Sequence, residues 1–298
     1  MPRRKTCIIL NPVAGSVKDL DALLKQLERL HGVVKIGQIV NAGEALAREA
    51  VREKYNYIIA AGGDGTLNEV VNGVARHRRK VRIGLLPLGT GNDFARCLNL
   101  PLDVEKCIDV LLSGRTKLVD LVRVRSDQDR YFINISAGGF SGLVNEKLTP
   151  EIKRTWGPLA YIRGAAAALA DLRAYRTDVT LDDEQKLSLD LYNVVVANGR
   201  FVAGGLPIAP EADPADGLLD IVLIPQRPAP EMALLVAEIL LGKHLADETI
   251  TFRRAHKVAV TSQPGMWFNV DGELVGNDPA EFEVLPRSLQ FVVGQDEK

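Results

Sequence analysis

Residues 60–70 read Ala-Ala-Gly-Gly-Asp-Gly-Thr-Leu-Asn-Glu-Val. The apolar run at 57–61 predicts a strand that ends at the first glycine, and the apolar spacing at 67–75 predicts a helix after it. Glycine lacks a Cβ atom, so the backbone of such a turn can approach a phosphate closely. The first turn of a helix adds unpaired N–H groups and a partial positive charge. This junction therefore predicts a phosphate-binding turn at the end of a strand.

Asp64 lies at the centre of this turn. It is not expected to bind a phosphate directly, because like charges repel, but its carboxylate can hold Mg²⁺ against nucleotide phosphates. Thr66 can cap the helix or bind a phosphate oxygen. The structural alternative is a tight strand–helix turn in which Asp64 or Thr66 is only the N-cap. Three glycines around one aspartate favour the phosphate-binding interpretation.

The sequence on both sides of this junction alternates between strand-like and helix-like patterns. We expect strands at 5–10, 34–40, 57–61 and 82–86, and helices at 17–30, 44–53 and 67–75. Repeated strand–helix units form parallel sheets, and the ligands of such sheets bind at the carboxyl ends of the strands. Two further loops, at 11–15 and 86–96, should therefore lie at the same edge. Each of them, taken alone, is also compatible with an ordinary turn.

The pattern changes after about residue 120. Short segments separated by turns predict strands at 118–125, 130–136, 178–181, 187–197, 219–224, 257–261, 266–270 and 281–285, with helices at 159–174 and 230–241. The sequence thus predicts an α/β protein with two domains. Residues 1–122 form a nucleotide-binding domain with a parallel sheet, and residues 123–298 form a β-rich sandwich with helical insertions for the lipid or other substrate. The last strand, at 289–293, can return to the first domain.

Composition and charge narrow the functional classes. The chain has 298 residues and a net charge of −1, which argues against non-specific nucleic-acid binding. Residues 1–125 carry 21 Lys and Arg against 13 Asp and Glu, a net of +8, while residues 126–298 carry 16 against 25, a net of −9. A basic half suits a polyanion such as a nucleotide. Two domains can also differ in surface charge for no functional reason.

No segment has the pattern of a secretion signal or a membrane span. Three widely spaced cysteines without a Cys-x-x-Cys pair indicate a reducing compartment and no structural zinc. The longest apolar stretches, 165–170 and 232–242, are shorter than the roughly 20 residues that cross a bilayer. We therefore expect a cytoplasmic protein with peripheral membrane contact. The basic run at 76–82 can touch anionic headgroups, although a solvated loop explains it better.

Two acidic segments in the second half carry further candidate residues. Residues 267–273, Trp-Phe-Asn-Val-Asp-Gly-Glu, form a strand pattern that leads to Asp271 and Glu273. Phosphoryl transfer to a hydroxyl needs a proton acceptor, commonly an aspartate, although Asp-Gly is more often a hairpin turn. Asp213 and Asp216 lie three residues apart in a turn and can share a divalent cation with a backbone carbonyl. A solvated acidic loop is equally compatible with that pattern.

Familiar nucleotide-binding motifs are absent from the sequence. The chain has no Gly-x4-Gly-Lys-Ser/Thr and no Gly-x-Gly-x-x-Gly after its first strand, which excludes P-loop and Rossmann sites. It also lacks the His-Arg-Asp and Asp-Phe-Gly motifs of protein kinases. The motifs that are present, Gly-Gly-Asp-Gly-Thr, Gly-Thr-x-Asn-Asp-Phe-Ala and a late Asp-Gly-Glu, resemble in this order the diacylglycerol kinase catalytic-domain family. The similarity is greatest to its soluble bacterial lipid kinases, and it runs from Asn11 to near the C-terminus.

This resemblance implies ATP and Mg²⁺ as cofactors and a lipid as substrate. The residues expected near the nucleotide are Asn11, Gly15, Asn41, Gly62, Gly63, Asp64, Gly65, Thr66, Leu67, Asn68 and Thr90. Asp271 is implied to be the proton acceptor, with Glu273 close to it. A structural Mg²⁺ is implied on Asp213, Asp216 and the Leu218 carbonyl. Asn41 departs from the family, in which this position is often Thr.

The function predicted from the sequence is transfer of the γ-phosphoryl group of ATP to a hydroxyl of diacylglycerol or a related lipid. Asp64, Asp271 and Glu273 are the predicted catalytic residues, and the lipid hydroxyl is expected to enter between the two domains. An NAD kinase-like enzyme and a non-catalytic nucleotide- or lipid-binding regulator are the alternatives. The expected partners are a lipid substrate and a membrane surface, with a homodimer as a further option.

Overall fold

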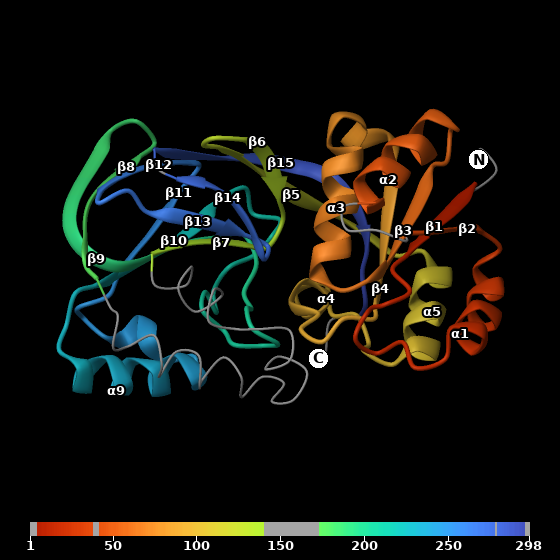
Figure 1. Cartoon of the computed structure of the whole chain (residues 1–298), viewed down its shortest axis with the longest axis horizontal. Coiled ribbons are helices and arrows are strands. Elements are labelled where there is room, and N and C mark those ends of the chain that lie inside the picture. The colour runs from red at the N-terminus through yellow and green to blue at the C-terminus, as the bar shows by residue number, and fades with distance from the viewer. Residues whose placement is uncertain (1–4, 38–41, 140–172, 278, 296–298) are drawn as a thin grey trace. The chain divides into compact units, whose positions relative to one another are not determined.

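The structure, a computed structural model, describes residues 5–37, 42–139, 173–277 and 279–295. The chain divides into two compact units (Figure 1): the first contains Met1–Leu121 and Pro286–Lys298, and the second contains Val122–Leu285. The helix predicted at 159–174 lies, as far as residue 172, outside the described residues. Within the described ranges, no helix is long and apolar enough to cross a membrane.

The first unit is built on a parallel sheet. Its strands are β1 (Thr6–Leu10), β2 (Val33–Ile36), β3 (Tyr57–Gly62) and β4 (Arg82–Pro87). β1 pairs in parallel with β2 and β3, and β3 pairs in parallel with β4. β4 also pairs in parallel with the C-terminal end of β15 (Ala280–Val292), at Gln290 and Phe291. The predicted parallel sheet is confirmed, and the carboxyl ends of β1, β3 and β4 meet at one edge.

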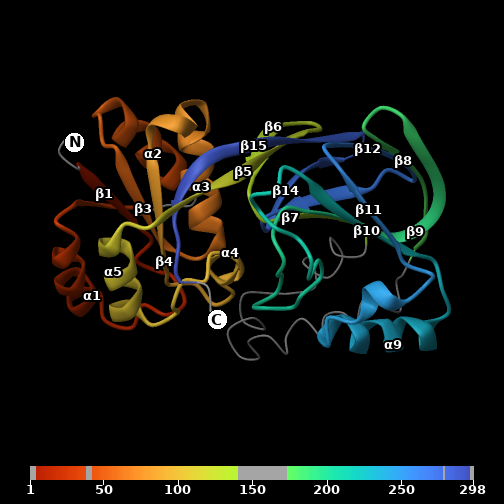
Figure 2. The same ribbon diagram turned by 180° about the vertical axis from the view of Figure 1, so that it is seen from behind.

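Helices cover both faces of this sheet (Figures 1 and 2). They are α1 (Leu20–Leu27), α2 (Ala42–Arg52), α3 (Asp64–Val74), α4 (Asp93–Cys97) and α5 (Val104–Ser113), with the 3₁₀ helices η1 (Glu28–Leu30) and η2 (Ala75–Lys80). α2 and α3 pack together on one face, and α1 and α5 lie on the other. Because both faces are covered, the apolar strands β1 and β3 are buried along their whole length.

Burial in this unit also sets the reactivity of the thiols. All three cysteines are buried thiols. Burial raises the pKa of the Cys7 thiol to about 11 and that of the Cys107 thiol to about 12. Since the thiolate is the reactive form of cysteine, Cys7 and Cys107 are core residues and not nucleophiles.

The second unit is an antiparallel, β-rich structure, so the predicted fold class is confirmed. Its elements are β5 (Thr116–Arg125), β6 (Asp129–Phe132), β7 (Ile135–Gly139), β8 (Tyr175–Leu181), β9 (Gln185–Ala197), β10 (Leu219–Pro225), α9 (Ala229–Leu240), η4 (His244–Ala246), β11 (Thr251–Ala255), β12 (Lys257–Gln263), β13 (Trp267–Val270) and β14 (Glu273–Asn277). The strand order is β14-β13-β7-β9-β8-β12-β15, and β10 pairs with β9 and β11. β5 begins in the first unit, and β15 ends there.

Two apolar clusters occupy the two faces of this strand set. One contains Phe132, Phe268 and Phe282, whose rings pack edge to face. The other contains β-strand residues together with Met232 and Leu235 of α9. Alternate residues of β9 and of β10 therefore contribute to different clusters, as the period of an extended strand requires.

Two local features of this unit matter for the candidate site. The strand predicted at 130–136 is two strands, β6 and β7, separated by Ile133 and Asn134. The strand predicted at 266–270 is followed directly by β14, so that Asp271 and Gly272 form the turn of a hairpin. The break between β6 and β7 presents the amides of Ile133 and Ile135 to the Asp271 carboxylate.

Candidate active site

The glycine-rich turn joins β3 to α3. Gly62 ends the strand, Gly63 precedes the helix, and the Gly63 carbonyl accepts the first helical hydrogen bond, from Leu67 N–H at 3.1 Å. A Cβ on Gly62 would overlap the Thr66 side chain, and a Cβ on Gly63 would lie 3.0 Å from the Cα of Gly89. These two glycines thus permit close packing of the loops. Gly65 is exposed, and a Cβ there would meet no atom within 4 Å.

The loops after β1 and β4 pack against this turn. The Asn11 side chain donates from Nδ2 to Thr66 Oγ1 at 3.3 Å, and the Leu88 amide donates to the Gly62 carbonyl at 2.9 Å. A Cβ on Gly15 would lie 2.6 Å from Thr90 Oγ1, so these two loops also touch. The predicted nucleotide residues that come together at this edge are Asn11, Gly15, Gly62, Gly63, Asp64, Gly65, Thr66 and Thr90.

The other predicted nucleotide residues are placed differently. Leu67 and Asn68 follow the turn, but both are buried, and the backbone and side-chain oxygens of Asn68 accept hydrogen bonds from Asn72 Nδ2. The Asn68 side chain therefore stabilises α3 from within, and the Leu67 side chain is part of the core. Asn41 lies outside the described residues, so its predicted contact with the nucleotide stays a prediction.

Asp64 is half-buried at the start of α3, and it caps another helix. Its Oδ2 accepts the amide hydrogen of Asp93, and its Oδ1 accepts that of Phe94, both at 3.1 Å. These are the first two amides of α4, which have no partner inside that helix. The capping alternative from the sequence thus describes a real contact, but to the neighbouring helix. Each carboxylate oxygen keeps a second lone pair, so Asp64 can also accept a hard cation such as Mg²⁺.

Asn92 shapes the second loop, at 86–96. It has a left-handed backbone with φ of 55°. Its Oδ1 accepts the Gly89 amide at 2.9 Å, and its Nδ2 donates to the Gly89 carbonyl at 2.8 Å. Asparagine tolerates this conformation better than most residues. The Gly-x-x-Asn spacing was the available signal for this reciprocal clamp.

Asp271 lies in the two-residue turn between β13 and β14, where Val270 pairs with Glu273. Asp271 has φ of 46° and Gly272 has φ of 97°, as hairpins with two left-handed residues require. The hairpin alternative from the sequence is therefore what the structure contains. The Asp271 carboxylate accepts the amides of Ile133 at 3.2 Å and Ile135 at 3.0 Å. It is thus fixed to the segment between β6 and β7.

Glu273 follows this turn and is partly exposed. Its Oε2 lies 3.5 Å from Nη2 of Arg130 on β6, with 21% and 34% of the Arg130 and Glu273 side chains exposed. Water screens a pair this accessible, so it adds little stability. Arg130 nevertheless offsets part of the charge of Glu273, through Oε2.

The acidic loop before β10 is neutralised from within the chain. Asp216 accepts the Leu218 amide on Oδ1 at 2.9 Å and pairs with the Arg254 guanidinium through Oδ2. Arg254 Nε also lies 2.9 Å from Oδ1 of the buried Asp220. Within the described ranges, no group of three or more His, Cys, Asp and Glu side chains is placed to hold a metal. Arg254 therefore compensates the charge of Asp216 in this arrangement.

Asp213, the other carboxylate predicted there, lies at the opposite end of this loop. Its Oδ1 accepts the Ala215 amide at 3.1 Å, and its carbonyl accepts the Asp216 amide at 3.3 Å. Both aspartates are thus engaged in the local turn. A structural magnesium on Asp213, Asp216 and the Leu218 carbonyl stays a prediction.

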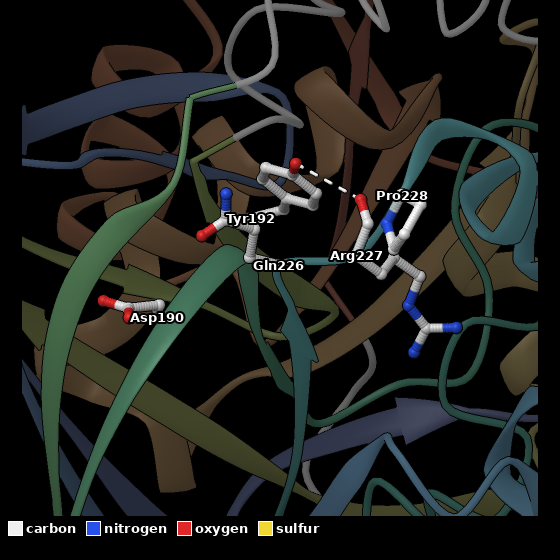
Figure 3. A pocket seen from close by; sticks show the side chains of 5 residues that line it. All are labelled: Asp190, Tyr192, Gln226, Arg227 and Pro228. Atoms are coloured by element: carbon white, nitrogen blue, oxygen red, sulfur yellow. Dashed lines mark hydrogen bonds between the residues drawn. The ribbon is translucent and has the colours of Figure 1, made fainter.

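A cavity of about 570 Å³ lies in the second unit before α9, lined by Asp190, Tyr192, Gln226, Arg227 and Pro228 (Figure 3). The Tyr192 hydroxyl donates to the Arg227 carbonyl at 3.3 Å. The Arg227 guanidinium binds Asp247 at 2.7 Å and the Thr249 hydroxyl. Its positive charge is therefore compensated, and none of the predicted site residues is among the described residues that line this cavity.

Family comparisons cover both halves of the chain. Residues 5–124 match the diacylglycerol kinase catalytic domain family, and residues 134–293 match the YegS C-terminal NAD kinase beta sandwich-like domain family. A protein named diacylglycerol kinase from Staphylococcus carnosus is 32% identical over 302 residues, which cover 99% of this chain and 97% of that protein. One of the same name from Bacillus subtilis is 32% identical, covering 98% and 97%.

Solved structures show the same fold. The crystal structure of a diacylglycerol kinase from Bacillus anthracis is similar with a TM-score of 0.81 at 21% identity, covering 99% of this chain and 98% of that one. The structure of an NAD kinase from Archaeoglobus fulgidus in complex with ATP is similar with a TM-score of 0.53 at 16% identity, covering 96% and 93%. The predicted likeness to lipid kinase and NAD kinase folds is thus confirmed.

Proposed function

The chain belongs to the diacylglycerol kinase family, and from this we propose that it transfers the γ-phosphoryl group of ATP to a hydroxyl of diacylglycerol or a related lipid. The observation that carries the proposal is the turn between β3 and α3. Three loops from the carboxyl edge of one parallel sheet meet there around the carboxylate of Asp64. Ligands of such sheets bind at this edge.

The proposed role of the first unit is to bind the nucleotide phosphates. The amides of α3 point out of its N-terminal end, next to the exposed Gly65, which leaves open space for a ligand. Asn11 and Thr66 offer polar side chains beside it, already bonded to each other. Fixed amides of this kind stabilise the charge of a phosphoryl group without rearranging.

Asp64 is proposed to carry the magnesium that accompanies the nucleotide. A bound Mg²⁺ would neutralise charge on the phosphates. The contribution of the chain is to hold the carboxylate still, since Asp64 is fixed by the two amides of α4. A carboxylate oxygen is the ligand type that magnesium prefers.

Asp271 is proposed to accept the proton of the lipid hydroxyl, with Glu273 close to it. Its carboxylate is fixed by the amides of Ile133 and Ile135 and lies only partly buried, at a hairpin tip. A preoriented aspartate is the usual acceptor in phosphoryl transfer to a hydroxyl. We further propose that the protein works in the cytoplasm at a membrane surface, because that is where the lipid resides.

A second candidate function is phosphorylation of NAD or a similar small molecule. Two observations favour it: the family matched by residues 134–293 is described as NAD kinase beta sandwich-like, and an NAD kinase shares the fold. The relatives at 32% identity over almost the whole chain carry the diacylglycerol kinase name. We therefore place the lipid kinase first and a non-catalytic regulator last.

Labelled ATP tests this proposal directly. The purified chain is incubated with Mg²⁺ and [γ-³²P]ATP in mixed micelles that contain diacylglycerol, phosphatidylglycerol, a sphingoid base or a prenol, and in parallel with NAD. Label in a phosphorylated lipid supports the proposal, and the acceptor that labels fastest identifies the substrate. Label in NAD alone would show that the second candidate, an NAD kinase-like activity, is correct. Binding of ATP without any labelled product would favour the regulator.

A further inference from the structure

The three-residue segment Ile133-Asn134-Ile135 determines where the Asp271 carboxylate points. Ile133 N–H donates to Asp271 Oδ2 at 3.2 Å, and Ile135 N–H donates to Asp271 Oδ1 at 3.0 Å. Asp271 N–H returns a hydrogen bond to the Ile135 carbonyl at 3.0 Å. A displacement of this segment would therefore turn or release the carboxylate.

Asn198 holds the other side of the same segment. It follows β9, where Ala197 pairs with Ile135. Its Nδ2 donates to the Ile133 carbonyl at 2.6 Å, and its backbone amide donates to the Asn134 carbonyl at 2.8 Å. The Gly199 amide donates to the same Asn134 carbonyl at 2.9 Å. The segment is thus clamped between Asn198 on one side and Asp271 on the other.

The amide oxygens of this cluster indicate that it is not arranged for stability alone. Asn198 is 1% exposed and Asn134 is 7% exposed. The Oδ1 atoms of both are buried, and neither has a hydrogen-bond partner in the part of the chain that the structure describes. An unsatisfied buried acceptor destabilises a fold. The Nδ2 group of Asn198 is nevertheless used, because it donates the hydrogen bond that fixes the Ile133 carbonyl.

We propose that Asn198 is a positioning residue for Asp271, acting through the Ile133 and Ile135 amides without touching the substrate. The proposal rests on the proposed role of Asp271 as proton acceptor. Departures from the most stable choice of residue are typical of functional sites, and a proton acceptor must lie within hydrogen-bonding distance of the hydroxyl it serves. Asn198 thereby keeps the Asp271 carboxylate in one place.

The matched control is Tyr192 on β9. Its hydroxyl, like Asn198 Nδ2, is a buried side-chain donor to a backbone carbonyl, that of Arg227 at 3.3 Å. Asn198→Ala and Tyr192→Phe each remove one such bond. We expect Asn198→Ala to lower kcat for lipid phosphorylation about 10-fold to 100-fold, since a small misplacement of a catalytic group has an effect of this size. The KM for ATP should stay within about two-fold. Tyr192→Phe should keep kcat near wild type with a similar loss in Tm.

Equal losses of kcat in the two variants, or an unchanged kcat in Asn198→Ala, would overturn the proposal. If Asn198→Ala does not fold, Asn198→Ser is used, because a serine fills part of the space but is too short to reach the Ile133 carbonyl. The same comparison with Tyr192→Phe then applies.

Hydrogen exchange tests the clamp independently of activity. In the wild type the Ile133 and Ile135 amides should be protected, because both are bonded to Asp271. Asn198→Ala should speed their exchange at least about 10-fold, whereas Tyr192→Phe should leave it unchanged. If exchange is faster in Asn198→Ala but the wild type phosphorylates no lipid, the clamp is supported and the proposed function is refuted. Unchanged exchange of both amides would refute the clamp whatever the activity.

Discussion

Asp64 in the first unit and Asp271 in the second are held in the same way by two different backbones. Asp64 accepts two consecutive amides, because the first N–H groups of a helix all point out of its N-terminal end. Asp271 accepts the alternate amides of Ile133 and Ile135, because in extended backbone only every second residue faces the same side. A parallel α/β unit and an antiparallel unit thus each fix one carboxylate.

This comparison shows that both aspartates have structural bonds in addition to their proposed chemistry. Replacement by alanine removes the charge and the hydrogen bonds together. Replacement by asparagine keeps the shape and one oxygen acceptor but removes the charge. Asparagine variants therefore separate the proposed chemical role of each aspartate from its structural one.

The largest effect is expected for Asp271→Asn. If Asp271 accepts the proton, kcat should fall about 10²- to 10⁴-fold, the usual contribution of a general base. Stability should fall only by about 1–2 kcal/mol, because one of the two amides can still be bound. Initial rates with labelled ATP and a thermal melt measure both quantities. A rate within three-fold of wild type would mean that Asp271 shapes the hairpin but does not accept the proton.

The next effect is expected for Asp64→Asn compared with Asp64→Ala. Loss of the charge should lower kcat/KM about 10- to 100-fold, which corresponds to the loss of one hydrogen bond to a charged group. It should also raise the Mg²⁺ concentration that gives the half-maximal rate. Asp64→Ala should add a loss of about 1–2 kcal/mol in stability, because α4 loses its cap. A Mg²⁺ titration and a thermal melt of each variant test this. Unchanged Mg²⁺ dependence in both variants would mean that Asp64 caps α4 but does not bind the magnesium.

Two glycines sharpen the comparison further. A Cβ on Gly65 or on Gly272 would meet no atom within 4 Å, but only Gly272 has a positive φ, of 97°. Gly65→Ala should therefore raise stability by up to about 1 kcal/mol yet lower activity about 10-fold, if a phosphate approaches that backbone. Gly272→Ala should lower stability by about 1–2 kcal/mol through backbone strain. Chemical denaturation and initial rates distinguish them, and full activity in Gly65→Ala would contradict the phosphate site.

Local sequence patterns predicted the elements whose causes are local. The apolar runs of β1 and β3 and the glycines at 62–65 were sufficient for the parallel sheet and its turn. Asp-Gly at 271–272 indicated the hairpin, as one of two alternatives. Helix α5 is not among the predicted helices, although its N-cap Asp103 and C-cap Gly114 were available signals.

Contacts that are distant in the sequence could not be predicted in the same way. Nothing near Asp64 indicates that it binds amides 29 and 30 residues later. The bonds from Ile133 and Ile135 to Asp271 span 138 and 136 residues. Arg254 reaches Asp216 over 38 residues, and the acidic loop by itself does not indicate this partner. Such partners depend on strand order, which the pattern of a single segment does not specify.

A third carboxylate, Asp220, differs from the other two because its neighbour is a guanidinium. Asp220 is 2% exposed, and burial raises its pKa to about 6 although the Arg254 charge opposes this. Folding thus favours the protonated form. The stabilisation is complete below the ordinary pKa near 3.8 and is lost as the pH rises through about 6. Asp220→Asn should therefore gain stability relative to wild type between pH 5 and pH 8, by about 1–3 kcal/mol.

Asp247→Asn is the control, since hydrogen bonds from Thr249 and Arg227 lower the pKa of Asp247 to about 2. The stability that Asp247 contributes is complete above its ordinary pKa and is lost only as the pH falls through about 2. The difference between Asp247→Asn and wild type should therefore be constant from pH 5 to pH 8. Urea denaturation at several pH values measures both differences. Parallel pH curves for all three proteins would mean that Asp220 stays ionised on folding, and that Arg254 outweighs burial.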